Sequence, residues 1–178
     1  GNECVIDASA DVGAASGRLA QTELLICLDL NVFSRTAGLE PLIEAVSCTK
    51  VLIDHHQEPD LKSFDLAFSV AEISSTCELL FYILKEMPDV GSAKELPHRA
   101  AYCLMTGMTT DTNNFANSTY PSTLRMASSL LAAGVDRDMI IYELYNKQRE
   151  NRIRLMGHAL KDLLTITDDG VAYMVIDS

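Results

Sequence analysis

Short apolar runs alternate with longer amphipathic segments along most of the chain. Each apolar run has the length of a buried strand, and the amphipathic segments have the spacing of helices. The expected strands are 23–31, 50–56, 65–70 and 170–177. The expected helices are 11–21, 38–47, 74–87, 97–107 and 121–134, followed by a mostly helical stretch over 136–165. Strands that alternate with helices predict an α/β fold, in which a parallel sheet is layered with helices on both faces.

Local signals mark where several of these helices begin and end. We expect Ser74 or Ser75 to cap the helix over 74–87, with Glu78 as the capping-box partner. Gly134 is expected to end the helix that precedes it, because glycine readily takes the left-handed conformation of a helix end.

Composition favours a compact protein with a reduced interior. The chain has 178 residues, of which 48% are apolar, which suits one compact domain. No apolar window is long enough for a membrane span, and the start lacks the features of a signal peptide. The five cysteines are scattered in apolar runs, so we expect small core residues of a cytoplasmic protein rather than disulfides or a zinc site.

The charge balance limits the partners of the protein. The formal net charge is −11, from 25 acidic and 14 basic residues. Such a surface repels long nucleic acids, which are bound through clustered lysine and arginine side chains. An acidic chain that handles phosphates must neutralise its site locally, and metal ions are the obvious means.

Polar side chains with metal-binding chemistry follow two of the expected strands. The runs "LLICLD" and "KVLID" end in Asp29 and Asp54, and His55 and His56 come next. Consecutive parallel strands joined by a helical crossover bring their carboxyl ends to one edge of the sheet, where ligands bind in open α/β folds. Carboxylates with imidazole suit Mn²⁺, Mg²⁺ or another borderline divalent ion. Strand-end aspartates that cap turns, and histidines that are simply hydrogen-bonded, are the alternative.

A third polar stretch, "MTGMTTDTNNF" (105–115), contains Asp111. We expect the helix to pass through Gly107 and to give way to a threonine-rich loop that holds Asp111. An Asx turn in that loop would explain Asp111 without any functional role.

Together these stretches resemble the DHH phosphoesterases, and most closely the branch that contains nanoRNase and pAp-phosphatase-like proteins. The resemblance covers nearly the whole chain and rests on four stretches in order: "LDLN" (28–31), "LIDHH" (52–56), "EISSTCELL" (72–80) and "TGMTTDTNNF" (106–115).

The resemblance implies a role for each matching position. It implies that Asp29 bridges two Mn²⁺ ions, with Mg²⁺ as a possible substitute, and that His55 and Asp111 are further metal ligands. His56 would face the scissile phosphate, and Asp54 would orient its neighbours, which makes these two the catalytic pair. The implied reaction is metal-assisted hydrolysis of a phosphoester, without a protein nucleophile.

The resemblance also implies a domain organisation. Residues 1–165 would form a DHH catalytic-type domain, and 166–178 would begin the connection to a C-terminal substrate-binding domain. The family's first motif, of the form H-x-x-x-D-x-D, has only a faint echo in residues 5–17. We therefore expect Asp7 and Asp11 to be surface polar residues.

Several functions agree with these features. The first is a manganese-dependent phosphohydrolase of short oligonucleotides, of 3′-phosphoadenosine 5′-phosphate (pAp), or of linear or cyclic dinucleotides. An inorganic pyrophosphatase or exopolyphosphatase of the same superfamily is the alternative within the enzyme class. From another class, the chain would be a non-catalytic domain that binds a metal or nucleotide, or a scaffold for a homodimer. An Asp-His-His that is only a polar strand end is the least specific interpretation.

Overall fold

The computed structural model describes residues 5–36 and 38–176. The chain divides into two compact units, Gly1–Val135 and Asp136–Ser178. All of the predicted site residues belong to the first unit.

A three-stranded parallel sheet forms the centre of the first unit. Its strands are β1 (Leu24–Leu28), β2 (Thr49–Asp54) and β3 (Leu66–Ser69), in the order β1-β2-β3. Leu28 lies opposite Ile53, and Asp54 lies opposite Ser69, so the three strands end at nearly the same level. The predicted parallel sheet is therefore confirmed. The segments that follow the three strands all begin at its carboxyl edge.

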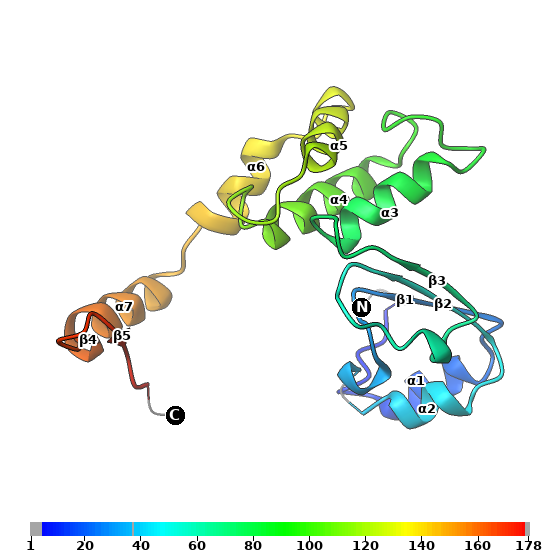
Figure 1. Cartoon of the computed structure of the whole chain (residues 1–178), viewed down its shortest axis with the longest axis horizontal. Coiled ribbons are helices and arrows are strands. Elements are labelled where there is room, and N and C mark those ends of the chain that lie inside the picture. The colour runs from blue at the N-terminus through cyan, green and yellow to red at the C-terminus, as the bar shows by residue number, and fades with distance from the viewer. Residues whose placement is uncertain (1–4, 37, 177–178) are drawn as a thin grey trace. The chain divides into compact units, whose positions relative to one another are not determined.

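Helices flank the sheet on both sides, as predicted. The helices are α1 (Val12–Leu19), α2 (Glu40–Ala45), α3 (Thr76–Lys85), α4 (His98–Asp111) and α5 (Pro121–Ala132), with 3₁₀ turns η1 (Phe33–Arg35) and η2 (Leu61–Ser63). Helices α1 and α2 lie on one side of the sheet, and α3 and α4 lie on the other (Figure 1).

Buried apolar side chains gather in two places, between the sheet and α1 and α2, and among α3, α4 and α5. Under α1 and α2, the fully buried Leu52 packs with Cys27, Phe33 and Ile43. Among α3, α4 and α5, the nearly inaccessible side chains are Phe81, Met105, Met108, Met126 and Leu130. Burying a side chain of this size stabilises the fold by about 1.5–3 kcal/mol, so β2 and the start of α3 rest on well-packed supports.

Cysteines occupy more varied positions than expected. Cys27 is buried, Cys48 and Cys77 are partly buried, and all four described cysteines are free thiols. Cys103 is exposed on α4, because the inward face of that helix is taken by neighbours such as Leu104. The expectation of core positions is therefore wrong for Cys103, and Cys4 lies outside the described residues.

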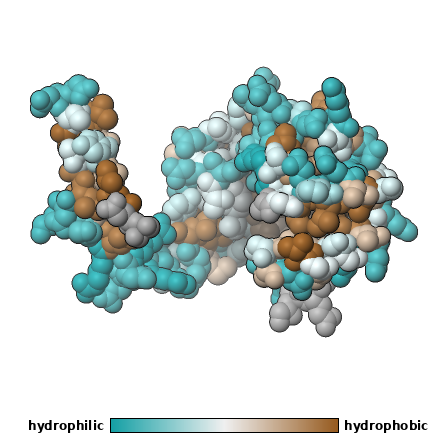
Figure 2. Space-filling view, turned by 90° about the horizontal axis from the view of Figure 1, so that it is seen from below, coloured by the Kyte–Doolittle hydropathy of each residue, from teal (hydrophilic) through white to brown (hydrophobic). Residues whose placement is uncertain are grey.

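The second unit is small and carries little buried apolar surface. It contains α6 (Arg137–Ile141), α7 (Glu150–His158), the π-helical segments η3 (Tyr142–Asn146) and η4 (Ala159–Leu163), and an antiparallel pair of short strands, β4 (Thr165–Ile166) and β5 (Ala172–Tyr173). Apolar side chains are interspersed along its surface (Figure 2). None of the helices in the described parts of the chain combines the length and apolar composition that a membrane crossing requires. The predicted division into 1–165 and 166–178 stays a prediction.

Candidate metal centre

Asp29 leaves the end of β1 in an unusual backbone conformation. Its φ is 63°, in the left-handed region, while its N–H still donates to the carbonyl of Ile53 on β2 at 3.2 Å. Aspartate tolerates this region better than most residues, but it costs free energy relative to extended backbone. The conformation turns the chain sharply at the sheet edge. A strained position of this kind supports the hypothesis of a functional site.

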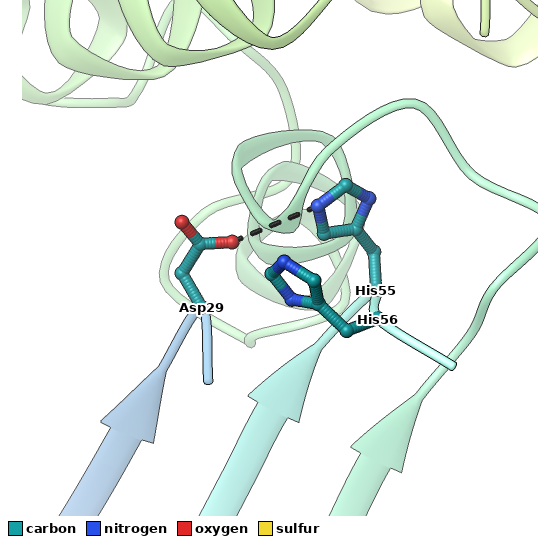
Figure 3. A group of neighbouring side chains, drawn as sticks. All are labelled: Asp29, His55 and His56. Carbon is teal, nitrogen blue, oxygen red and sulfur yellow. Dashed lines mark ion pairs between the residues drawn. The ribbon is translucent and has the colours of Figure 1, made fainter. Parts of the chain in front are cut away.

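His55 lies between two carboxylates. Its Nε2 atom is 3.3 Å from Oδ2 of Asp111 and 3.7 Å from Oδ1 of Asp29. The imidazole is only 19% exposed, whereas Asp29 and Asp111 are 58% and 39% exposed. Asp29 and His55 point toward each other from neighbouring strands (Figure 3). Both carboxylates thus converge on one ring nitrogen at the mouth of the site.

Asp111 is the last residue of α4. The prediction that it lies in a loop is therefore wrong. The threonine-rich stretch stays helical because its inward side chains, Met108 and Thr109, are fully buried in the fold. Thr110 Oγ1 donates within the helix to the carbonyls of Thr106 and Gly107. Gly107 also permits close packing of α4 on α3, since a Cβ at that position would overlap Cys77 Sγ. The helix therefore carries Asp111 to the sheet edge on a rigid support.

The surroundings of Asp111 disfavour its charged form. Burial is the main cause and raises the pKa of Asp111. The neighbouring His55 lowers this pKa, Asp29 raises it by less, and His56 lowers it by the least. The same two carboxylates act on Cys77, whose pKa is raised to about 11, chiefly by burial. The thiol of Cys77 is therefore protonated near neutral pH and is a poor ligand or nucleophile. The excess negative charge at this edge is what a divalent cation would neutralise.

His56 has a separate partner. Its Nδ1 lies 2.7 Å from Oδ1 of Asp54, and its backbone N–H donates to Oδ2 of the same carboxylate at 3.1 Å. Asp54 is completely buried. Because a carboxylate oxygen accepts, the Nδ1 atom of His56 carries the proton in this pair and Nε2 is left to act on something else. Asp54 thus orients His56 through two hydrogen bonds.

The donor set fits a divalent metal ion. One ligand atom from each of Asp29, His55 and His56 lies within 4.8 Å of the others. Asp111 adds a second carboxylate beside His55. Carboxylate oxygens with imidazole nitrogens suit Mn²⁺ and related borderline ions, and the arrangement contains no thiolate that would select a soft metal. All five residues predicted for the site, including Asp54, are thus at this edge, while their individual roles stay predictions.

Thr76 contacts the site, whereas the sequence analysis attributed the run of residues 74–76 to helix capping alone. Its hydroxyl donates to Oδ1 of Asp29 at 2.9 Å, although 47 positions separate the two residues. Ser75 caps α3 by accepting from the N–H of Glu78 at 3.0 Å, so the cap needs only one hydroxyl. The signal that could have revealed Thr76 is the run of three consecutive hydroxyl residues, which is more than a helix cap requires.

Asn31 ties together the two loops that border the site. Its Nδ2 donates to the carbonyl of Gln57 at 2.9 Å, and its own carbonyl accepts from the N–H of Asp60 at 2.9 Å. Arg35 donates to its side-chain oxygen at 3.3 Å. The last residue of "LDLN" therefore fixes the loop after β1 to the loop that follows His56.

A cavity of about 170 Å³ lies directly beside the two carboxylates. It is lined by Leu28, Asp29, Ser75, Thr76, Cys77, Leu80, Gly107, Thr110 and Asp111. Its volume is well below the ≈ 300–1,000 Å³ typical of sites for drug-sized ligands. The cavity has room for a phosphoryl group or an ion with water, but a whole nucleotide would have to extend beyond it.

Comparison with known proteins agrees with this fold. A crystal structure of an exopolyphosphatase-related protein from Bacteroides fragilis superposes with a TM-score of 0.86 at 30% sequence identity. The match covers 95% of this chain and 48% of that one, so the chain spans about half the length of this structural relative. No curated protein matches the chain significantly. Residues 3–108 match the DHH family, N-terminal domain, and the chain therefore belongs to the DHH family.

Proposed function

We propose that the chain provides the metal centre of a phosphohydrolase that acts on small phosphorylated nucleotides with Mn²⁺ as the preferred ion. The substrates in view are short oligonucleotides, pAp and dinucleotides. The observation that carries the proposal is the convergence of Asp29 and Asp111 on Nε2 of His55, beside a second histidine whose orientation is fixed. DHH phosphoesterases are metal-dependent, and this donor set fits that requirement.

Each residue has a task that follows from its surroundings. Asp29, His55 and Asp111 would hold the metal, and His55 would lose its Nε2 proton as the ion binds. When bound, the ion supplies Lewis-acid polarisation of a phosphoryl oxygen and activation of water. His56 presents Nε2 toward the same edge. Because Nδ1 holds the proton of the neutral ring, Nε2 can donate a proton to a phosphate or leaving oxygen only when the ring is in its imidazolium form. Asp54 keeps that ring in its tautomer and orientation.

Charge and size support a small substrate. The net charge of −11 opposes the binding of long nucleic acids, which depend on basic surfaces. The small cavity beside the carboxylates suits a phosphoryl group rather than a base. We also propose a cytoplasmic location, and a homodimer as the assembly to test.

A second candidate is hydrolysis of inorganic pyrophosphate or polyphosphate. The name of the Bacteroides fragilis relative, exopolyphosphatase-related, favours it. The chemistry at the metal would be the same, because a phosphoanhydride and a phosphoester present the same phosphoryl group. The two candidates therefore differ in the leaving group.

The test is a phosphate-release assay on this chain and on the complete gene product. The substrates are pAp, a 5′-phosphorylated dinucleotide, pyrophosphate and tripolyphosphate, each with Mn²⁺, with Mg²⁺ and with a chelator. We expect the complete product to hydrolyse pAp or the dinucleotide fastest with Mn²⁺, and the chelator to stop the reaction. Faster hydrolysis of tripolyphosphate would select the second candidate, and no hydrolysis with either ion would overturn both.

A pair of variants shows whether the activity comes from this centre. Asp29→Asn keeps the size of the side chain but weakens its bond to a metal, so we expect at least about a 100-fold loss of activity. The matched control is Asp89→Asn, because Asp89 is exposed beyond the far end of α3. Equal losses in the two variants would mean that the activity does not depend on the proposed centre.

A further inference from the structure

Glu78 is a fully buried carboxylate in the first turn of α3. Its Oε2 atom accepts hydrogen bonds from the backbone N–H of Ser74 at 3.2 Å and from Thr123 Oγ1 at 2.7 Å, and it is also in very short contact with the hydroxyl of Ser74. Its Oε1 atom has no hydrogen-bond partner among the described residues. No lysine or arginine forms an ion pair with it in the described part of the chain.

This arrangement differs from the capping box that the sequence predicts. In a capping box, the glutamate would accept from the backbone N–H of the cap residue, Ser75. Glu78 instead reaches one residue further, to Ser74, and across to α5. Burying a carboxylate that has one oxygen unsatisfied is costly, and the positive end of the α3 dipole offsets only part of that cost. A helix cap alone does not require a buried carboxylate, since an exposed glutamate would also cap the helix.

One arm of the Glu78 contacts leads to Asp29. Ser74 is fixed through both its N–H and its hydroxyl, Ser75 caps the helix, and the next residue, Thr76, donates to Asp29. The direction of the Thr76 hydroxyl depends on how α3 begins. Glu78 holds the residue that immediately precedes the cap, so it sets that beginning.

The other arm leads to the segment that follows Asp111. Thr123 donates to Glu78 and accepts from the N–H of Tyr120 at 3.1 Å, so it links α3 to the first turn of α5. The connection between Asp111 and Tyr120 contains four non-glycine residues with positive φ: Asn113, Asn114, Phe115 and Ser118. A connection with this much backbone strain keeps its shape only if both of its ends are held. Glu78 holds the α5 end.

We propose that Glu78 is a positioning residue of the metal centre, which acts on Asp29 through Ser74 and Thr76 and on Asp111 through Thr123. The proposal rests on the proposed function for the identity of the centre. Glu78 does not touch a ligand atom itself. It fixes the two helix starts on which the carboxylate positions depend, and the low-polarity surroundings make those hydrogen bonds strong.

The experiment compares three variants of the chain. Glu78→Ala removes all the hydrogen bonds, and Glu78→Gln keeps an oxygen that can accept them. Leu130→Ala is the control, because Leu130 is fully buried on α5 and its loss weakens the same helix packing without touching the hydrogen bonds. The measurements are the backbone amide NMR spectra of the metal-free chain and the affinity for Mn²⁺ by calorimetry.

We expect Glu78→Ala to shift or broaden the amide signals of Asp29, Thr76 and Asp111. We also expect it to weaken Mn²⁺ binding about 10–100-fold, as the loss of groups that orient metal ligands does elsewhere. Glu78→Gln should restore most of both properties, while Leu130→Ala should lower stability and leave the three amide signals in place. If Glu78→Ala does not fold, Thr123→Val cuts the arm to α5 alone, and it should perturb Asp111 more than Asp29.

Two results would overturn the proposal. One is that the amide signals of Asp29 and Asp111 stay unchanged in Glu78→Ala, or in Thr123→Val where that variant replaces it. The other is that Leu130→Ala perturbs them equally. The amide spectra are recorded without metal, so they test the positioning role of Glu78 independently of Mn²⁺ binding. A wild-type chain that binds no Mn²⁺ would count against the proposed function instead.

Discussion

His55 and His56 are adjacent in the chain, yet their surroundings are opposite. His56 forms a 2.7 Å hydrogen bond with a completely buried aspartate that also accepts from its backbone. His55 stands 3.3 and 3.7 Å from two partly exposed carboxylates. The two rings contact each other, with centroids 4.8 Å apart, so the contrast lies in the carboxylates that each ring meets.

The pair of Asp54 and His56 is complete without a further partner, whereas the two carboxylates beside His55 are not fully neutralised. Both oxygens of Asp54 are hydrogen-bonded to His56, so this pair needs no further partner to be stable. Around His55, the two negative charges share one imidazole, and the pKa of Asp111 is raised rather than lowered. Burial is the main cause of that raised pKa, and two carboxylates with one imidazole between them suit a cation. The two histidines therefore should fail in different ways when they are replaced.

The largest predicted effect separates the two histidines. His55→Ala should weaken Mn²⁺ binding at least about 100-fold, because it removes the ligand between the two carboxylates. His56→Ala should leave Mn²⁺ binding within a few-fold and lower kcat by about 10²–10⁴-fold, the range for loss of a general acid. Calorimetry with Mn²⁺ and steady-state kinetics on the complete gene product measure the two quantities. Loss of Mn²⁺ binding in His56→Ala would make His56 a ligand and end the distinction.

A smaller effect is expected at Thr76, which orients the carboxylate of Asp29 beside His55. Thr76→Val keeps the shape of the side chain and removes only the hydrogen bond to Asp29. We expect about tenfold weaker Mn²⁺ binding, since ligand orientation is typically worth 10–100-fold. The control is Thr49→Val, at the opposite end of β2. An unchanged Mn²⁺ affinity in Thr76→Val would show that Asp29 is held by its backbone alone.

The sequence was sufficient to predict what depends on local pattern. Apolar runs that end in Asp29 and Asp54 indicate parallel strands with a polar carboxyl edge, and a parallel sheet brings those ends together without further information. The resemblance then added Asp111, which lies far away in the chain. The predicted elements agree with the structure to within a few residues at most boundaries.

The sequence could not predict the contacts between distant positions. It also could not predict how far the helix α4 continues through its threonine-rich end. The bond from Thr76 to Asp29 spans 47 positions, and the bond from Thr123 to Glu78 spans 45. Neither leaves a periodic signal. Asp111 was predicted to lie in a loop because threonine and asparagine disfavour helices. The burial of Met108 and Thr109, which outweighs this preference, is visible only in three dimensions.

The smallest predicted effect tests whether the charged carboxylate of Asp111, beside His55, lowers the stability of the metal-free fold. Asp111 places a negative charge at the carboxyl end of α4, where the helix dipole disfavours it, and burial and Asp29 raise its pKa. A raised folded-state pKa means that the folded protein binds the proton more tightly than the unfolded chain. The free energy of unfolding is therefore greatest below the ordinary aspartate pKa, and it falls as pH rises through the raised value.

Asp111→Asn mimics the protonated form, so with chelator at pH 8 the variant should be more stable than the wild type. The gain should be less than about 1 kcal/mol, because the partly exposed carboxylate is screened by solvent. Urea unfolding measures it, and the gain should shrink as pH is lowered. Saturating Mn²⁺ should reverse the order, since only the wild type gains binding free energy from the ion. If Asp111→Asn is the less stable protein in chelator, the carboxylate stabilises the fold and the contrast between the two histidines loses its electrostatic basis.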